Sequence, residues 1–532
     1  MQKNSVVSNI YLSMKKRNSD LHGLFYLILV SSLVSLAFYP LMSRSLWVDE
    51  AMLFRNYPIE NFSEIFLPLR YYDQAATPLY SLFASLIATL DISTGRYAST
   101  LFIVSAIVWL LTYRQSSAVT LFVAILGAFA FYSPLIMYSE FKHYGFEVIG
   151  VLISIRWFLF KKNTDALNSK DVLILFSSLT FGISTLITST VTICIFLFKK
   201  YLSLKKIISK DFIYLFFFIG IAITYYLLIK KVTVFQIENY VDAYSNKGFI
   251  GNLKALLAAG FGVVGKQGIV LVSLATALLF TALKDIQVQR LLLLSVVTAF
   301  AFFVASALGL YPATNARHMN WSAGFYVALI FYGIKSNLDH KRRLPKLIAI
   351  TLCILLTLII SRSIYNVHNN NVENTENNIA ISFIRDLPPS NVGLWIGGQP
   401  VIEYYQKIYP DLSKHSYFGL INVESDRIDL KNQKSSFDDY DYSEFKDKKG
   451  AWGRMVMFRI MNDYSVPARS LLNQLPRGKD FYIFASHYDV QAKDGYSVMR
   501  VIALHEELKN KNCSFSVIKQ LRNLSIYQVA CV

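Results

Sequence analysis

Charged residues are scarce in this chain. Asp, Glu, Lys and Arg make up only 17% of its 532 residues, whereas 54% are hydrophobic and 15% are aromatic. Soluble domains of ordinary composition carry about a quarter charged residues, so this chain is too apolar to be one of them. The deficit of charge therefore predicts a protein that lies in a lipid bilayer.

Cysteine is also rare, with four residues. Cys194 and Cys353 lie in apolar runs, while Cys513 and Cys531 lie beside two expected strands near the C-terminus. A disulfide would join the last two if their domain faces an oxidising compartment, and the sequence leaves this open. A strong metal motif is lacking too, because His505-Glu506 has no second histidine at the spacing of a zinc protease site.

Acidic residues are outnumbered, 35 against 53 Lys and Arg, which gives a formal net charge of +18. No aromatic and basic soluble module accompanies this charge, which argues against nucleic-acid binding. The basic residues instead gather at the ends of apolar runs, which is the positive-inside signature of membrane topology. The clusters are residues 15–17, 161–162, 199–200, 205–206 and 341–343.

Long apolar runs are what the chain has in abundance. Runs such as 24–42 and 212–229 approach the roughly 20 residues that cross about 30 Å of hydrocarbon as a helix. The first run follows basic residues but lacks a small-x-small cleavage site, so we expect a retained anchor. Twelve candidate crossings follow in order: 24–42, 78–90, 98–113, 117–132, 145–160, 172–187, 190–198, 212–230, 268–283, 291–310, 320–335 and 346–361.

Charge reduces these twelve candidates to about eleven crossings. The basic stretch 341–346 marks the inner end of the last run, so the C-terminal domain should lie outside. We favour 78–90 as the run that fails to cross, since it spans only about 20 Å. A single long crossing over 172–198 is the alternative, but it would place Lys161 and Lys162 outside. The outer loops are then 43–77, 133–144, 231–267 and 311–319.

Two domains follow from this pattern: a transmembrane domain over 1–365 and a C-terminal domain over 366–532. The expected fold is mainly α, a polytopic helical bundle with a small C-terminal α/β soluble domain. In the outer loop 43–77, Asn61-Phe-Ser-Glu64 looks like a capping box that opens an interfacial helix. In the C-terminal domain we expect strands at 391–396, 480–485, 514–519 and 525–530, and helices from Pro400 and at 495–509.

Asp49 and Glu50 come directly after the first apolar run, at the expected outer surface. One interpretation is that they only end a helix and mark the interface. The other is a general base, because an Asp with an ordinary pKa near 4 is ionised at neutral pH and can accept a proton from an attacking hydroxyl.

Several segments, in order and spacing, resemble the GT-C superfamily of membrane glycosyltransferases. In particular the chain is similar to the bacterial protein O-mannosyltransferases and aminoarabinose transferases, and the likeness covers most of it. The segments that carry the resemblance are Leu46-Trp-Val-Asp-Glu-Ala, Ala76-Thr-Pro-Leu-Tyr80, Arg96-Tyr-Ala-Ser99, Ser133 to Tyr144, Tyr311-Pro-Ala-Thr-Asn-Ala-Arg-His318 and Phe484-Ala-Ser-His487. The chain departs from relatives that have an Arg in the fourth segment, where it has Lys142-His143, and a His-Pro pair before Leu-Tyr, where it has Thr77-Pro78.

The resemblance implies an inverting transferase that takes a sugar from a polyprenyl-phosphate donor on the outer membrane face. Asp49 matches the acidic base position of the family, and Glu50 its acidic neighbour. Displacing a phosphate builds negative charge, so cations should stabilise the transition state. Arg317, Lys142 and His143 are the candidates for phosphate binding, against the alternative of interfacial side chains that merely snorkel. Further candidate substrate contacts are Glu140, Tyr144, Tyr72 and His318.

Other motifs favour rival functions less well. Gly260-Phe-Gly-Val-Val-Gly265 lacks the strand context of a nucleotide site and indicates close helix packing or a bend. Asp439-Tyr-Asp441 imitates a metal-binding Asp-x-Asp but sits in a polar run. A lipid-linked sugar flippase or transporter would place charges deep inside helices, and an O-antigen polymerase or ligase would place its chemistry in a late loop.

The expected partners are a polyprenyl-phosphate sugar donor, membrane lipids, and an acceptor that is a glycolipid, lipopolysaccharide or other glycan, or a protein. No cofactor is specified by the sequence, although a divalent metal remains compatible with it. We expect a bacterial inner membrane with the active site on the periplasmic side.

Overall fold

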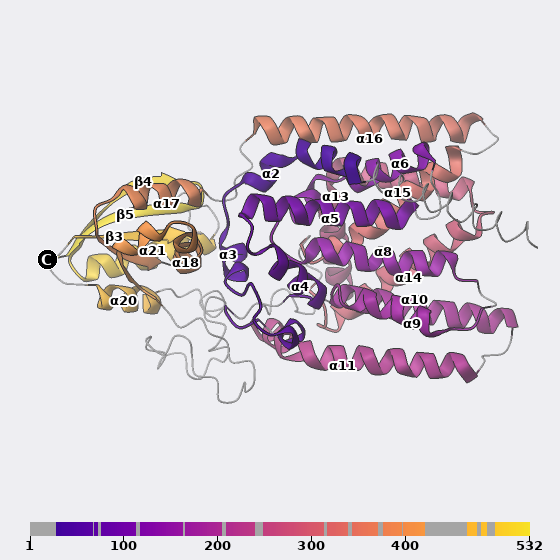
Figure 1. Cartoon of the computed structure of the whole chain (residues 1–532), viewed down its shortest axis with the longest axis horizontal. Helices are drawn as coiled ribbons and strands as arrows, with labels where there is room; N and C mark the ends of the chain where they lie inside the picture. Colours follow the sequence, from indigo (N-terminus) through magenta and orange to yellow (C-terminus); the bar gives the residue numbers. More distant parts are fainter. Residues whose placement is uncertain are drawn as a thin grey trace, which may run out of the picture. The chain divides into compact units, whose positions relative to one another are not determined.

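The structure is a computed structural model, and it describes residues 28–67, 69–72, 76–112, 117–162, 165–204, 209–239, 248–312, 317–338, 343–370, 376–395, 397–420, 465–475, 480–486 and 495–531. The chain divides into two compact units (Figure 1). The helical unit comprises Met1–Met42, Ser93–Ala222 and Asn246–Asn370, and the mixed unit comprises Ser43–Ile92, Ile223–Ser245 and Asn371–Val532. The first loop therefore groups with the C-terminal residues.

The helical unit consists of long helices that run side by side (Figure 1). Five helices among the described residues are long and apolar enough to cross a bilayer, or six if the bent pair α6 and α7 is one span. The mainly helical fold is thus confirmed. The helices are α2 (Tyr39–Ser43), α5 (Ile92–Thr112), α6 (Ala118–Ala128), α7 (Tyr132–Tyr138), α8 (Tyr144–Phe160), α9 (Ser169–Leu179), α10 (Ile183–Leu204), α11 (Ser209–Asn239), α13 (Gly248–Thr281), α14 (Ile286–Ala307), α15 (Ala323–Leu338) and α16 (Arg343–Asn369).

Small and hydroxyl-bearing residues let α8 approach α9 and α10 closely. A Cβ on Gly150 would lie 2.4 Å from Thr185 and 2.8 Å from Phe181, so only glycine fits there. Ser154 and Ser189 share a hydrogen bond of 2.8 Å across the α8–α10 contact. In a bilayer, where no hydrophobic force drives helices together, such close packing and buried hydrogen bonds stabilise the association.

Short length or a glycine limits the helices that several of the apolar runs form. The run from Pro78 forms only the 10-residue α4 (Pro78–Ile87), about 15 Å long, which is half the thickness of the hydrocarbon. The alternative of one long crossing over 172–198 is wrong, because α9 ends at Leu179 and α10 begins at Ile183, with Gly182 at φ +148° between them. Gly265, at φ +68°, bends α13 as its motif predicted.

Buried ion pairs connect the helices at the end of the unit where α8 ends. Lys161 contacts Asp171 at 2.6 Å, and Lys200 contacts Asp211 at 2.5 Å with both side chains fully buried. The guanidinium of Arg290, on α14, donates to the carbonyls of Phe158 and Leu159 in the last turn of α8. A cation that binds terminal carbonyls stabilises a helix C-terminus.

Replacing Lys200 by Met should destabilise the helical unit by about 3–5 kcal/mol, because it leaves the Asp211 carboxylate buried without its cation. The double variant Lys200→Met with Asp211→Leu should recover part of this loss. Unfolding temperatures in detergent would measure both effects, with the exposed Lys346→Met as a matched control. Equal unfolding temperatures for Lys200→Met and Lys346→Met would contradict the expectation.

The first loop of the mixed unit forms α3 (Val48–Phe54), the 3-10 turn η1 (Phe62–Phe66) and α4. The expected capping box is wrong: Asn61 makes no side-chain cap, and the helix stops after one 3-10 turn. Asn61 and its neighbours Phe62 and Ser63 are exposed, and Ile65 is the one buried residue of the turn, which is too little packing to extend it. Phe62 is 69% exposed, which still suits a membrane interface.

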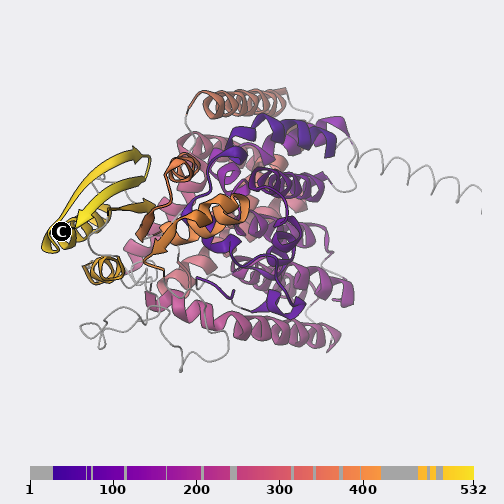
Figure 2. The ribbon, with the colours of Figure 1, turned by 60° about the vertical axis from the view of Figure 1, so that its left-hand side comes forward.

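The C-terminal residues form the expected α/β fold (Figure 2). Its five-stranded sheet has the order β2-β1-β3-β5-β4, in which β1 is parallel to β2 and β3, whereas β5 is antiparallel to β3 and β4. Trp395, Leu471, Ile483, Leu504 and Tyr527 belong to its core. The elements are α17 (Asn377–Asp386), β1 (Asn391–Trp395), α18 (Gly398–Ile408), η3 (Pro410–Lys414), β2 (Ser416–Phe418), α20 (Ser465–Gln474), β3 (Phe481–Ser486), α21 (Gly495–Asn510), β4 (Cys513–Leu521) and β5 (Leu524–Cys531).

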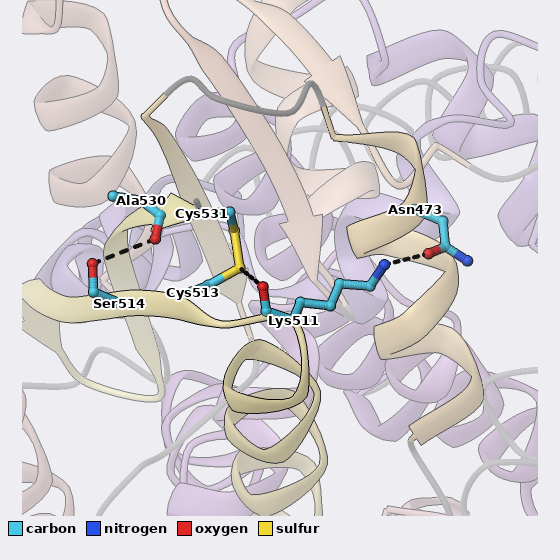
Figure 3. Close-up of a disulfide and its surroundings, with 6 residues drawn as sticks. All are labelled: Asn473, Lys511, Cys513, Ser514, Ala530 and Cys531. Carbon is cyan, nitrogen blue, oxygen red and sulfur yellow. Dashed lines mark hydrogen bonds between the residues drawn. A yellow bond between two sulfur atoms is a disulfide. The ribbon is translucent and has the colours of Figure 1, made fainter.

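A disulfide joins Cys513 to Cys531 at the open end of the β4–β5 hairpin (Figure 3). The two cysteines are direct partners in the strand register, and their Cα atoms are 4.0 Å apart. Beside them the Ser514 hydroxyl donates to the carbonyl of Ala530, at 3.4 Å. A disulfide of this kind persists in an oxidising compartment.

The cysteines should therefore label in two classes. The unfolded, non-reduced chain should take two maleimide adducts, at Cys194 and Cys353, and four after reduction. Cys513→Ser should free Cys531 and give three adducts without reduction. Gel mobility after labelling with a polyethylene-glycol maleimide would count them, and four adducts before reduction would contradict the disulfide.

Candidate functional site

Two distant segments of the helical unit bring predicted site residues together. Lys142 and His143 lie in the short turn between α7 and α8, Tyr144 begins α8, and Arg317 and His318 precede α15. Around the Tyr144 ring centroid, Lys142 Nζ lies at 5.7 Å, the His143 ring at 4.7 Å and the His318 ring at 6.1 Å. We name Lys142, His143, Arg317 and His318 the cationic cluster.

Two hydrogen bonds hold these segments in place. The Asn320 side-chain amide donates to the Tyr144 carbonyl at 3.1 Å, across 176 positions of the chain. The Tyr311 hydroxyl donates to the carbonyl of His318, and Trp321 stacks on Phe302 at 3.7 Å between ring centroids. Sequence reasoning missed Asn320, since no local pattern shows which distant carbonyl an amide reaches.

Burial gives the cationic cluster its electrostatic character. Lys142 is only 6% exposed. Burial, then the charges of Lys142 and His318, lowers the pKa of His143 to about 3, and burial, then Arg317 and Lys142, lowers the pKa of His318 to about 4. Both imidazoles are therefore neutral at pH 7 before an anion arrives. Lys142 and Arg317 carry the positive charge, and an anionic group would be stabilised strongly in so water-poor a place.

Glu140 lies in the same turn, buried at 3% exposure, and its carbonyl accepts from the amide of Lys142 at 2.8 Å. Tyr72 belongs to the mixed unit instead. Its hydroxyl donates to Glu403 at 2.9 Å, and Gln399 donates to the other oxygen of Glu403 at 3.0 Å. Burial and Glu403 raise the pKa of the Tyr72 phenol well above its ordinary value. The structure thus shows Tyr72 as an anchor between the first loop and α18.

Asp49 and Glu50 both lie in the first turn of α3, in the mixed unit. Consecutive helical residues point about 100° apart, and accordingly Asp49 is partly exposed while Glu50 is fully buried. Of the two carboxylates, Asp49 is therefore the one that solvent reaches. The buried Asn377 donates to the carbonyl of Leu46 at 2.7 Å and accepts from Ser486 at 2.9 Å, which fixes the start of α3 on β3. Sequence reasoning missed Asn377.

Metal-binding candidates gain little support. Among the described residues, no group of three or more His, Cys, Asp and Glu side chains is arranged to hold a metal ion. His505 lies on α21 as expected, where its ring packs on Phe515 at 4.6 Å and its Nε2 lies 3.2 Å from the Tyr527 hydroxyl. Asp439 and Asp441 lie outside the described residues.

No family model matches the chain, and no curated protein matches its sequence.

Proposed function

We propose that the chain is a membrane glycosyltransferase that moves a sugar from a polyprenyl-phosphate donor to a hydroxyl acceptor with inversion. The observation that carries this proposal is the convergence of Lys142, His143 and His318 around Tyr144, with Arg317 acting on His318. A buried cluster of this kind suits a phosphate whose negative charge grows as it leaves the anomeric carbon.

The proposed reaction is a single displacement. The acceptor oxygen attacks the anomeric carbon, the bond from that carbon to the phosphate oxygen breaks, and the phosphate keeps the electron pair. Asp49 accepts the proton of the acceptor hydroxyl, and its position on α3 and its partial exposure support this role. Lys142 and Arg317 stabilise the leaving polyprenyl phosphate. The acceptor class is a glycolipid, lipopolysaccharide or protein.

The distribution of charge supports about eleven crossings with the cationic cluster on the outer face. Basic residues mark the inner side of a membrane protein. At the end of the helical unit that is opposite to the start of α8 lie four of them: Lys161, Lys200, Arg290 and Arg343. The 17-residue α8 is about 26 Å long and spans most of the hydrocarbon. We propose a bacterial inner membrane, with the reaction in the periplasm, where the Cys513–Cys531 disulfide would persist.

The test is sugar transfer by the purified full-length chain in liposomes that contain radiolabelled polyprenyl-phosphate sugars and candidate acceptors. Transfer from the lipid donor, with none from a nucleotide sugar, is the expected result. Movement of the labelled lipid between leaflets without transfer would favour the flippase alternative. Joining of preassembled glycan chains without use of the monosaccharide donor would favour an O-antigen polymerase or ligase.

A further inference from the structure

Glu147 is a buried acid that the proposed displacement does not use. It lies in the first turn of α8, one helical turn after His143, and its side chain is 9% exposed. Its Oε1 lies 3.9 Å from His143 Nε2, and the Ser184 hydroxyl donates to its Oε2 at 2.7 Å. An acid within a membrane helix is costly, so it is retained where it has a function and a partner.

The turn between α9 and α10 is shaped around this carboxyl group. Gly182 has φ +148°, and a Cβ there would lie 2.8 Å from Oε1 and 2.9 Å from Cγ of Glu147. A side chain at this position would therefore displace the carboxyl group from His143. Both the conformation and the space require glycine.

His143 faces charged or titratable groups from three parts of the chain. Lys142 is its neighbour in the turn, Glu147 faces it from α8, and His318 acts on it from the segment before α15, where Arg317 acts on His318 in turn. With a pKa lowered to about 3, His143 alone would stay neutral at pH 7. A buried acid and an imidazole in contact titrate as a pair. Burial disfavours a charged carboxylate, so the resting pair holds one proton, on Glu147.

We propose that Glu147 and His143 form a proton-sharing pair, in which Glu147 is a positioning residue that delivers the proton to His143 when an anionic phosphodiester binds the cationic cluster. The proposal rests on the proposed class of donor. In the step, the bond from the proton to Glu147 Oε1 breaks and a bond to His143 Nε2 forms. Ser184 stabilises the carboxylate that remains, and the phosphodiester meets a third cation beside Lys142 and Arg317. The gap of 3.9 Å closes in the complex, as hydrogen bonds of empty sites commonly do.

Calorimetric titration of the detergent-solubilised full chain with polyprenyl methyl phosphate tests this pair. The probe is a phosphodiester that does not titrate near neutral pH and has no sugar to transfer. Comparing two buffers of different ionisation heat gives the number of protons taken up on binding. Wild type should take up close to none, because the pair already holds the proton. Glu147→Gln should take up about one, with Kd rising up to about tenfold per pH unit.

The controls separate protonation from folding. Asp285→Asn, at the N-cap of α14, replaces an acid by an amide that can still cap, and it should match wild type. Gly182→Ala should behave as Glu147→Gln, since it displaces the same carboxyl group. Adding His143→Ala to Glu147→Gln should abolish the uptake. Equal proton uptake by wild type and Glu147→Gln, or no binding of the probe by wild type, would overturn the proposal that Glu147 and His143 share a proton. If the probe binds and proton uptake follows the expected pattern, but no sugar is transferred, the Glu147–His143 pair would be supported and only the proposed transferase activity would be contradicted.

Discussion

Replacing Asp49 by Asn should lower sugar transfer by about 10²- to 10⁴-fold, the contribution of a general base, while the chain stays folded. Asn has the shape of Asp but cannot accept the proton of the acceptor hydroxyl. Because Asp49 is the partly exposed member of the acidic pair on α3, its replacement removes no buried charge. Initial rates of transfer from a radiolabelled polyprenyl-phosphate sugar, at matched protein in liposomes, measure the effect.

The matched control is Glu60→Gln, an exposed acid in the same loop that should transfer at the wild-type rate. Binding of the donor should survive in Asp49→Asn, because the phosphate contacts are assigned to other residues. Undiminished sugar transfer by Asp49→Asn would show that Asp49 is not the general base. Loss of transfer together with donor binding would make Asp49 a binding residue instead.

Local sequence patterns correctly predicted strands and helices whose formation depends on neighbouring residues in the chain. The strands at 514–519 and 525–530 appear as β4 and β5, and the helix at 495–509 appears as α21, because alternation and helical periodicity report directly on one buried face. The pattern Asn61 to Glu64 failed for the opposite reason. A cap is worth about 1 kcal/mol, and a turn with a single buried side chain, Ile65, has too little packing to be maintained as a longer helix.

Contacts between residues far apart in the chain could not be predicted from the sequence. The resemblance named Lys142, His143 and His318, yet no spacing shows that they surround one tyrosine. Tyr72 illustrates the same limit, because its partner Glu403 lies 331 positions further on. Buried amides such as Asn320 carry no local signature, since what matters is the carbonyl that they reach after folding.

Replacing Arg317 by Ala should lower transfer by about 10²- to 10³-fold, as removal of one group that stabilises a developing anion does. Most of the loss should fall on kcat, since negative charge on the phosphate grows as the bond to the sugar breaks. Lysine at this position keeps the charge but lacks the planar fork of arginine, so Arg317→Lys should recover only part of the activity. Lys142→Ala should act in the same direction, because Lys142 is the other permanent cation of the cluster.

Arg343→Ala is the matched control for Arg317→Ala, because it removes an exposed arginine at the start of α16, one helix away from Arg317 and at the opposite end of α15. It should leave kcat and KM unchanged. A loss that fell on KM alone would mean that Arg317 binds the donor equally in the ground state and the transition state. An unchanged rate would leave Arg317 as a solvated interfacial residue, and the phosphate would then have to be stabilised by Lys142 and the His143–Glu147 pair.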